Sequence, residues 1–206
     1  MEKLTYDFQD GKGEVPAHKH SNGGGWVADS ATVDDSAYVG PDARVYGNAN
    51  VFGKAKVLDK VKVYGNPKVF GDAWVCGDAE VFGNAKVFGN SWVYGDAQVY
   101  GNAWVFGYAW VYGDAQVYGD AWVFGKAKVL DKVKVYGDAQ VYGNTWVFGY
   151  AWVYGNAKVF GDAWVCGDAE VFGKAKVFGN ALVCSDAQAY DNDTVFGNAE
   201  VCGSET

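Results

Sequence analysis

Composition and charge narrow the class of protein first. The chain has 206 residues, among them 29 glycines but only 3 prolines, and aromatic residues make up 17% of it. A chain this rich in aromatic residues is not disordered, and because it has no run of about 18 apolar residues, we exclude a transmembrane helix. The net charge of -8 argues against nucleic acid as a partner, which would require clustered Lys and Arg.

Residues 1–24 precede a repeat that occupies the rest of the chain. They are mostly polar, lack the apolar stretch of a secretory signal, and contain both histidines, His18 and His20. Since a stack of strands leaves unpaired backbone groups at its end, we expect these residues to form an N-terminal cap segment. The two histidines have no other Cys or His close to them in sequence, so we expect capping hydrogen bonds from them and not a metal site.

From residue 25 onward the sequence repeats every six residues. Valine occupies every sixth position from Val27 to Val201, thirty positions with the one exception of Ala189, and alanine lies two residues earlier at twenty-three of them. The alternation Ala-x-Val is typical of a short strand with one buried face. The Gly-Asn or Gly-Asp that follows favours a corner, since glycine tolerates a positive φ. We therefore predict an all-β chain of short strands and corners.

This pattern resembles the hexapeptide-repeat family, in which three hexads form one triangular coil of a left-handed parallel β-helix. The resemblance covers residues 25–203 and implies about ten coils. We therefore expect residues 25–206 to form one left-handed β-helix of thirty hexapeptide repeats. Two internal repeats agree with an 18-residue coil, because segment 52–65 recurs after 72 residues and segment 69–82 after 90. The leader 16–28 resembles that of uncharacterised bacterial and bacteriophage hexapeptide-repeat proteins. This implies a microbial or phage origin and, with no signal peptide, a cytoplasmic or virion-associated location.

The residues on either side of each valine point outward, and their period of 18 separates three faces. The first, the tyrosine face, carries a column of aromatic residues that includes Tyr100, Tyr118 and Tyr136. The second, the phenylalanine face, carries a similar column that includes Phe88, Phe106 and Phe124. On the third, the mixed face, tryptophans form a row that Lys128 interrupts: Trp74, Trp92, Trp110, Trp146 and Trp164.

Two interpretations of these columns are compatible with each other. Stacked rings on in-register strands stabilise the solenoid itself. An apolar surface of this size also marks an interaction site, because monomers rarely expose contiguous apolar patches beyond a few hundred Å². We take the aromatic residues named above as candidate interaction residues.

The sequence offers little for catalysis. Many hexapeptide-repeat proteins resemble acyltransferases, which use a histidine in a coil and looped insertions around the substrate. Here both histidines precede the coils and no insertion interrupts the repeat. We therefore expect that the protein is not an enzyme and that it binds neither a cofactor nor a metal ion.

The four cysteines share one position in the coil: Cys76, Cys166, Cys184 and Cys202. The last three fall on consecutive coils, within the Cα range of a disulfide. A disulfide and a thiol metal site are both open, but we favour unpaired cysteines that replace aromatic residues in a column. Unpaired cysteines would agree with a reducing interior.

The sequence thus favours a non-enzymatic structural or assembly rod. We expect a homo-oligomer that forms through the aromatic faces or through an open C-terminal strand edge, where Asp193 and Ala189 weaken the last coils. The alternative is a glycan-binding or adhesive module, as on a phage fibre, in which sugar rings stack on the flat row of Trp74, Trp92 and Trp110. Neither interpretation includes nucleic acid or a membrane span.

Overall fold

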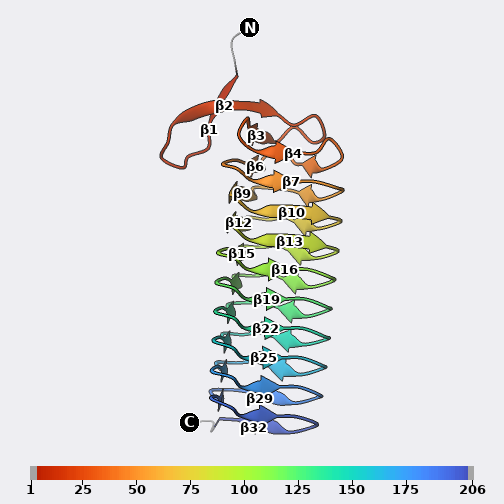
Figure 1. Cartoon of the computed structure of the whole chain (residues 1–206), viewed down its shortest axis with the longest axis vertical. Coiled ribbons are helices and arrows are strands. Elements are labelled where there is room, and N and C mark those ends of the chain that lie inside the picture. The colour runs from red at the N-terminus through yellow and green to blue at the C-terminus, as the bar shows by residue number, and fades with distance from the viewer. Residues whose placement is uncertain (1–3, 204–206) are drawn as a thin grey trace.

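The computed structural model describes residues 4–203, which form an all-β parallel solenoid (Figure 1). Ten strands lie on the phenylalanine face and ten on the mixed face, while the tyrosine face has twelve because two N-terminal strands join it. The prediction of about ten 18-residue coils is therefore confirmed, and the left-handed winding stays a prediction. Residues 4–203 form no helix, so none of them belongs to a helix that could cross a membrane.

The strands are short and repeat in the order tyrosine, phenylalanine, mixed face. The tyrosine face contains β1 (Thr5–Asp7), β2 (Glu14–Lys19), β3 (Trp26–Ala28), β6 (Arg44–Val45), β9 (Lys62–Gly65), β12 (Glu80–Gly83), β15 (Gln98–Val99), β18 (Gln116–Val117), β21 (Lys134–Val135), β24 (Trp152–Val153), β27 (Glu170–Val171) and β30 (Gln188–Ala189). The phenylalanine face contains β4 (Thr32–Val33), β7 (Asn50–Val51), β10 (Lys68–Gly71), β13 (Lys86–Gly89), β16 (Trp104–Val105), β19 (Trp122–Val123), β22 (Gln140–Val141), β25 (Lys158–Val159), β28 (Lys176–Val177) and β31 (Thr194–Val195). The mixed face contains β5 (Tyr38–Val39), β8 (Lys56–Val57), β11 (Trp74–Val75), β14 (Trp92–Val93), β17 (Trp110–Val111), β20 (Lys128–Val129), β23 (Trp146–Val147), β26 (Trp164–Val165), β29 (Leu182–Cys184) and β32 (Glu200–Cys202).

Successive coils pair in parallel with a register of 18 residues. Val93 aligns with Val75 of the coil before it and with Val111 of the coil after it. Inside the coils the repeated valines and alanines are completely buried, as their 0% exposure from Val39 to Val183 shows. Because like residues lie on like residues, the outward positions also form continuous columns along the rod.

Glycine is favoured at the corners for two physical reasons. Gly77 has a φ of +78°, and a Cβ on it would lie 2.8 Å from the backbone nitrogen of Gly95 in the next coil. Asp59 and Asp131 stand at two corners without glycine and take φ values of 54° and 63°. Beside the corner glycines, Asn and Asp side chains form a hydrogen-bonded ladder, in which Asn102 accepts from Asn84 at 3.2 Å and donates to Asp120 at 3.0 Å.

A hairpin covers the first coil. Strands β1 and β2 pair antiparallel, and β2 pairs antiparallel with β3 of the first coil, at the upper end of the rod in Figure 1. Phe8 in this segment is only 2% exposed and stacks on Tyr46 with ring centroids 4.8 Å apart. The outermost residues of the two expected segments, 1–3 and 204–206, lie outside the described residues.

The last described coil differs from the central ones. Val195 is 8% exposed and Val201 is only partly buried, whereas the central valines are fully buried. Asp193 stands where most coils have an inward alanine, and its carboxylate accepts the backbone N–H of Tyr190 at 3.0 Å. The core is therefore less completely covered at this coil.

Candidate functional site: the outward aromatic columns

The tyrosine face carries an unbroken column of stacked rings. Tyr100, Tyr118 and Tyr136 lie in its centre, with centroids 4.8 and 4.9 Å apart and ring planes within 3° of each other. Two carboxylates lie beside the column, since the Tyr64 and Tyr154 hydroxyls donate to Glu80 and Glu170 at 3.2 Å. The parallel β-strands fix the spacing, so the column follows directly from the 18-residue register.

The phenylalanine face carries a second column of the same kind. Phe88, Phe106 and Phe124 follow one another with centroids 4.9 Å apart and planes within 1°. Trp104 and Trp122 stack on each other at 5.1 Å and meet these phenylalanines edge to face, as Trp104 does with Phe106 at 6.4 Å and 74°. Each Trp thereby makes one stacked contact along the rod and edge-to-face contacts with the neighbouring phenylalanines.

The tryptophan row on the mixed face forms in two parts. Trp92 stacks on Trp74 at 5.0 Å and on Trp110 at 5.5 Å, and Trp146 stacks on Trp164 at 5.8 Å. The Lys128 ammonium lies between the two parts, 5.2 Å from the Trp110 ring and 3.9 Å from the Trp146 ring. The lysine that interrupts the row in the sequence therefore joins its two parts through cation–π contacts.

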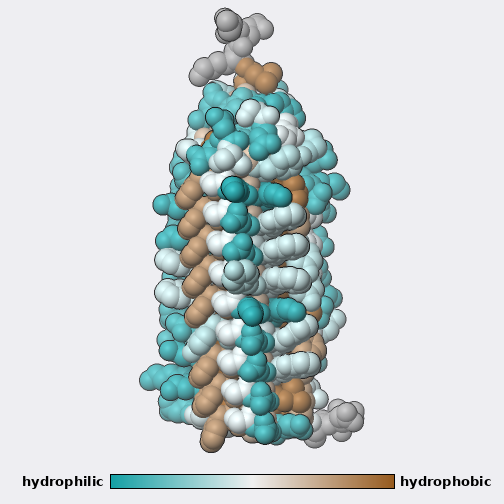
Figure 2. Space-filling model, turned by 90° about the vertical axis from the view of Figure 1, so that its right-hand side faces the viewer, coloured by the Kyte–Doolittle hydropathy of each residue, from teal (hydrophilic) through white to brown (hydrophobic). Residues whose placement is uncertain are grey.

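The orientation of the rings corrects one expectation. A six-membered ring with its hydrogens is wider in its own plane than the spacing of about 5 Å between these centroids, so neighbouring rings cannot lie flat side by side. They stand face to face with their edges outward, like the tilted plates that follow one another along the rod in Figure 2. The row of Trp74, Trp92 and Trp110 is therefore present, but its ring faces contact one another and not the solvent.

Sequence reasoning missed two of the most exposed aromatic residues. Tyr108 and Tyr150 are 60% and 56% exposed and stand at corners, in the position that usually holds Asn or Asp. Among the indoles the most exposed are Trp122, Trp152 and Trp164, at 37%, 38% and 47%. The break of the Asn/Asp column by Tyr was the signal that could have identified the corner tyrosines.

Partial burial makes the hydroxyls and thiols of the columns poor nucleophiles. Burial, with smaller effects from Asp10 and Glu80, raises the pKa of Tyr46 to about 12. Burial also raises the pKa of the Tyr100 and Tyr118 hydroxyls and of the Cys76 and Cys166 thiols. Near neutral pH these groups stay protonated, so they can donate hydrogen bonds but do not attack as anions.

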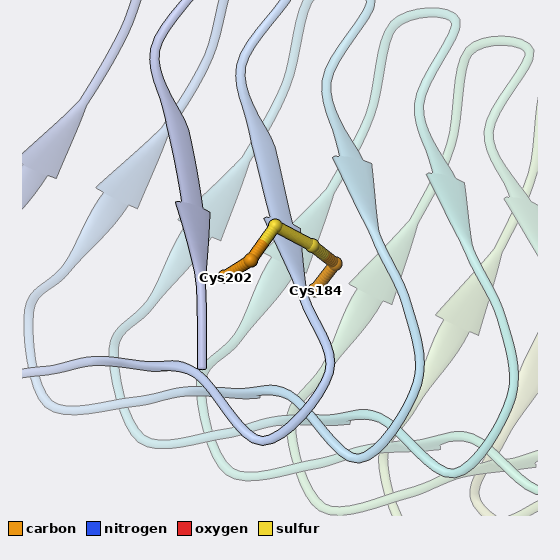
Figure 3. Close-up of a disulfide and its surroundings, with 2 residues drawn as sticks. All are labelled: Cys184 and Cys202. Carbon is orange, nitrogen blue, oxygen red and sulfur yellow. A yellow bond between two sulfur atoms is a disulfide. The ribbon is translucent and has the colours of Figure 1, made fainter. Parts of the chain in front are cut away.

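The preference for unpaired cysteines is wrong for one pair. Cys184 and Cys202 form a disulfide between β29 and β32, with Cα atoms 4.7 Å apart (Figure 3). In-register neighbours on adjacent coils lie within the distance that a disulfide needs, and this outweighs the substitution pattern. Cys76 and Cys166 are free, and the argument for a reducing interior does not apply to the bonded pair.

The histidines and the other candidate ligands lie apart from the columns. His18 Nδ1 is 3.1 Å from an Asp29 carboxylate oxygen, and the largely buried His20 places its Nδ1 3.1 Å from the carbonyl oxygen of Asn22. Both contacts lie at the N-terminal hairpin. Residues 4–203 contain no group of three His, Cys, Asp or Glu side chains placed to hold a metal ion.

Comparison with known proteins agrees with the fold. A family model described as the YdcK beta solenoid repeat matches residues 97–113, which is about one coil in the middle of the rod. No curated protein matches the chain. The match supports a solenoid repeat, and the finer identity as a hexapeptide-repeat protein stays a prediction.

Proposed function

We propose that this protein is a non-enzymatic structural rod whose aromatic columns contact further copies of the chain or other partners. One observation carries the proposal: rigid, outward ring edges run along all three faces of a solenoid. The rings are fixed by stacking before any partner arrives, so little side-chain entropy is lost when they are covered. Aromatic side chains are also the residues most often found at the energetic centres of interfaces.

The exposed rings at the corners and at the ends of stacks are the natural contact points. Tyr108 and Tyr150 are among the most exposed aromatic residues, and Trp164 is the most exposed indole. Their apolar area adds about 25 cal/mol per Å² on burial, before the cost of association is subtracted. We place the contacts here and not in the middle of a stack, where neighbouring rings already cover the ring faces.

The non-enzymatic part of the proposal rests on the positions of the reactive groups. His18 and His20 contact Asp29 and Asn22, where the hairpin meets the first coil, and neither lies in a later coil. Ser30, the hydroxyl closest in sequence to Asp29, donates its Oγ–H to the carbonyl of Gly47 at 2.6 Å. A nucleophile activated by a histidine needs a direct hydrogen bond to it, and this serine uses its hydroxyl elsewhere.

Light scattering during size-exclusion chromatography tests the proposal. We expect the apparent mass of the intact chain to rise with concentration up to about 100 μM, and to rise less when Trp122, Trp152 and Trp164 are replaced by Gln. Replacing Gln140, Gln188 and Thr194 by Ser is the matched control, because these outward positions carry no ring. A monomer at about 100 μM, where contacts stronger than about -5.5 kcal/mol would be seen, would contradict self-association.

Glycan binding is the second candidate, and the exposed indoles favour it in a narrower form. Sugar rings stack on indole faces, and in this rod the most exposed indoles are Trp122, Trp152 and Trp164. A glycan that quenches Trp fluorescence of a monomer, and no longer does so in the triple Gln variant, would support an adhesive module. Quenching that persists in that variant would contradict it.

A further inference from the structure

A cleft of about 530 Å³ lies where the N-terminal hairpin meets the first coils. Its walls include the rings of Tyr6 and Trp26 and four cationic side chains: Lys19, Arg44, Lys60 and Lys62. Arg44 is the one arginine of the chain. A volume of this size is typical of small-molecule sites, and the cleft is independent of the aromatic columns proposed as contact surfaces.

The charge of this cleft opposes that of the chain. The protein as a whole carries -8, yet four cations converge here against two carboxylates, Asp42 in the wall and Glu80, which contacts Lys62 at 2.9 Å. Four positive and two negative charges leave a local excess of +2. Concave surfaces lined by one sign of charge concentrate ions of the opposite sign.

Two of the cations are placed against each other by the fold. Arg44 and Lys62 are direct neighbours on β6 and β9, and like charges that face each other on paired strands are destabilising. Lysine pairs in the same relation occur on the phenylalanine face, at Lys68 with Lys86 and Lys158 with Lys176, but those four residues do not line this cleft. An anion in the cleft would relieve the repulsion between Arg44 and Lys62.

The arginine is oriented before any ligand arrives. Its Nη1 donates to Gln9 Oε1 at 3.0 Å, and its guanidinium carbon lies 5.8 Å from the Tyr6 ring centroid. Tyr6 stacks on Trp26 at 4.3 Å, and the Lys19 ammonium lies 4.4 Å from the Trp26 ring. Because these contacts occupy the ring faces, the cleft suits an anionic group and not a flat aromatic ligand.

We propose that this cleft binds a phosphate group, either free or carried by a small molecule. A guanidinium binds two phosphate oxygens at once, and lysine ammonium groups bind the remaining ones as point charges. A phosphate dianion also matches the local excess of two positive charges. The role is separate from the contact surfaces of the rod, so either proposal can fail without the other.

The chain supplies its own control for this site. Segment 124–137 has the same sequence as segment 52–65, so Lys132 and Lys134 correspond to Lys60 and Lys62. Lys134 aligns with Gln116 in place of an arginine, and Lys132 and Lys134 lie 5.1 and 4.6 Å from the rings of Tyr150 and Trp152. The two lysine pairs therefore share their local sequence and differ in their neighbours.

Calorimetric titration of the full chain with inorganic phosphate, and separately with glucose 6-phosphate, tests the proposal. We expect a dissociation constant at or below about 1 mM for at least one probe. Arg44→Gln, Lys60→Gln and Lys62→Gln should each weaken binding about tenfold, since each removes a charged hydrogen bond. Lys132→Gln and Lys134→Gln should leave it unchanged. If glucose 6-phosphate binds more tightly than inorganic phosphate, the ligand is a phosphate group carried by a small molecule. If it binds equally or more weakly, the ligand is free phosphate.

Two results would overturn the proposal. One is the absence of saturation by about 10 mM for both probes. The other is an equal loss of binding in the Lys60 and Lys132 variants, which would mean diffuse attraction to the surface. Circular dichroism of every variant confirms folding, and Lys60→Gln decides the outcome if Arg44→Gln does not fold, because Lys60 is an exposed corner residue.

Discussion

Segments 52–65 and 124–137 have identical sequences but different surroundings. Their corners at Asp59 and Asp131 agree, because both aspartates take a positive φ and both accept a backbone N–H from the next coil, at 3.0 and 3.1 Å. Their side-chain chemistry differs, because Lys62 faces Arg44 and Glu80 while Lys134 faces Gln116 and Trp152. Local sequence thus decides the conformation of this corner, and residues 18 positions away decide what the surface beside it can do.

The largest expected loss of stability comes from substitutions in the buried core of each segment. Val61 and Val133 point inward and are completely buried. An aspartate at either position would bury an unpaired carboxylate, so Val61→Asp and Val133→Asp should each reduce the free energy of unfolding by about 3–5 kcal/mol in denaturant titrations. The outward control Gln140→Asp should cost about 0.5 kcal/mol, and equal midpoints for all three variants would refute the inside–outside assignment.

A smaller effect is expected at the corners. Asp59→Ala and Asp131→Ala should each cost about 1–2 kcal/mol, because alanine is strained at a positive φ and the hydrogen bond to Gly77 or Gly149 is lost. Asp→Gly at the same positions should cost less, since glycine accepts that φ. Thermal unfolding of the four variants measures this, and alanine variants as stable as the glycine variants would show that φ has no energetic role there.

The smallest effect is a difference in alkaline sensitivity between Tyr64 and Tyr136. Burial raises the pKa of both hydroxyls, and the Glu80 carboxylate, which accepts the Tyr64 hydroxyl at 3.2 Å, raises that of Tyr64 further. Both phenols hold their proton more tightly in the folded chain than in the unfolded one. Their contribution is therefore complete below the ordinary tyrosine pKa of about 10 and is lost as the pH rises above it.

Tyr64→Phe should therefore remove more of the alkaline loss of stability than Tyr136→Phe does. Denaturant titrations between about pH 9 and pH 11 compare the two variants with the parent chain. Glu170 also raises the pKa of Tyr136, so coinciding pH profiles for the two variants would mean that Glu80 affects Tyr64 no more than Glu170 affects Tyr136.

Much of the fold was predictable because it follows from the six-residue period of the sequence. Valine at every sixth position determines which side chains point inward, and the repeats at 72 and 90 residues determine the length of the coil. The candidate columns follow by simple counting, and the structure brings Tyr100, Tyr118 and Tyr136 together as expected. The period says nothing about the hand of the winding.

The rest depended on three-dimensional detail that a period does not contain. The face-to-face orientation of the tryptophans follows from ring width against coil spacing. The period placed Cys166, Cys184 and Cys202 within reach of one another, but it did not indicate that Cys184 and Cys202 would bond while Cys166 stays free. The cationic cleft joins Lys19 of the hairpin to Arg44 and Lys62 of the coils. Because the hairpin lies outside the repeat, nothing in the periodic pattern indicated where it would pack.

The columns and the comparison of the two segments both depend on the 18-residue register. Disulfide cross-linking tests this register most directly. In a chain with Cys76 and Cys166 changed to Ser, Gln98→Cys with Gln116→Cys should cross-link completely on oxidation, because these outward residues are in-register neighbours within the Cα range of a disulfide. Gln98→Cys with Lys86→Cys, two hexads apart on another face, should not cross-link. Mass spectrometry of the unreduced protein gives the answer, and cross-linking of the second pair or its absence in the first would contradict the account.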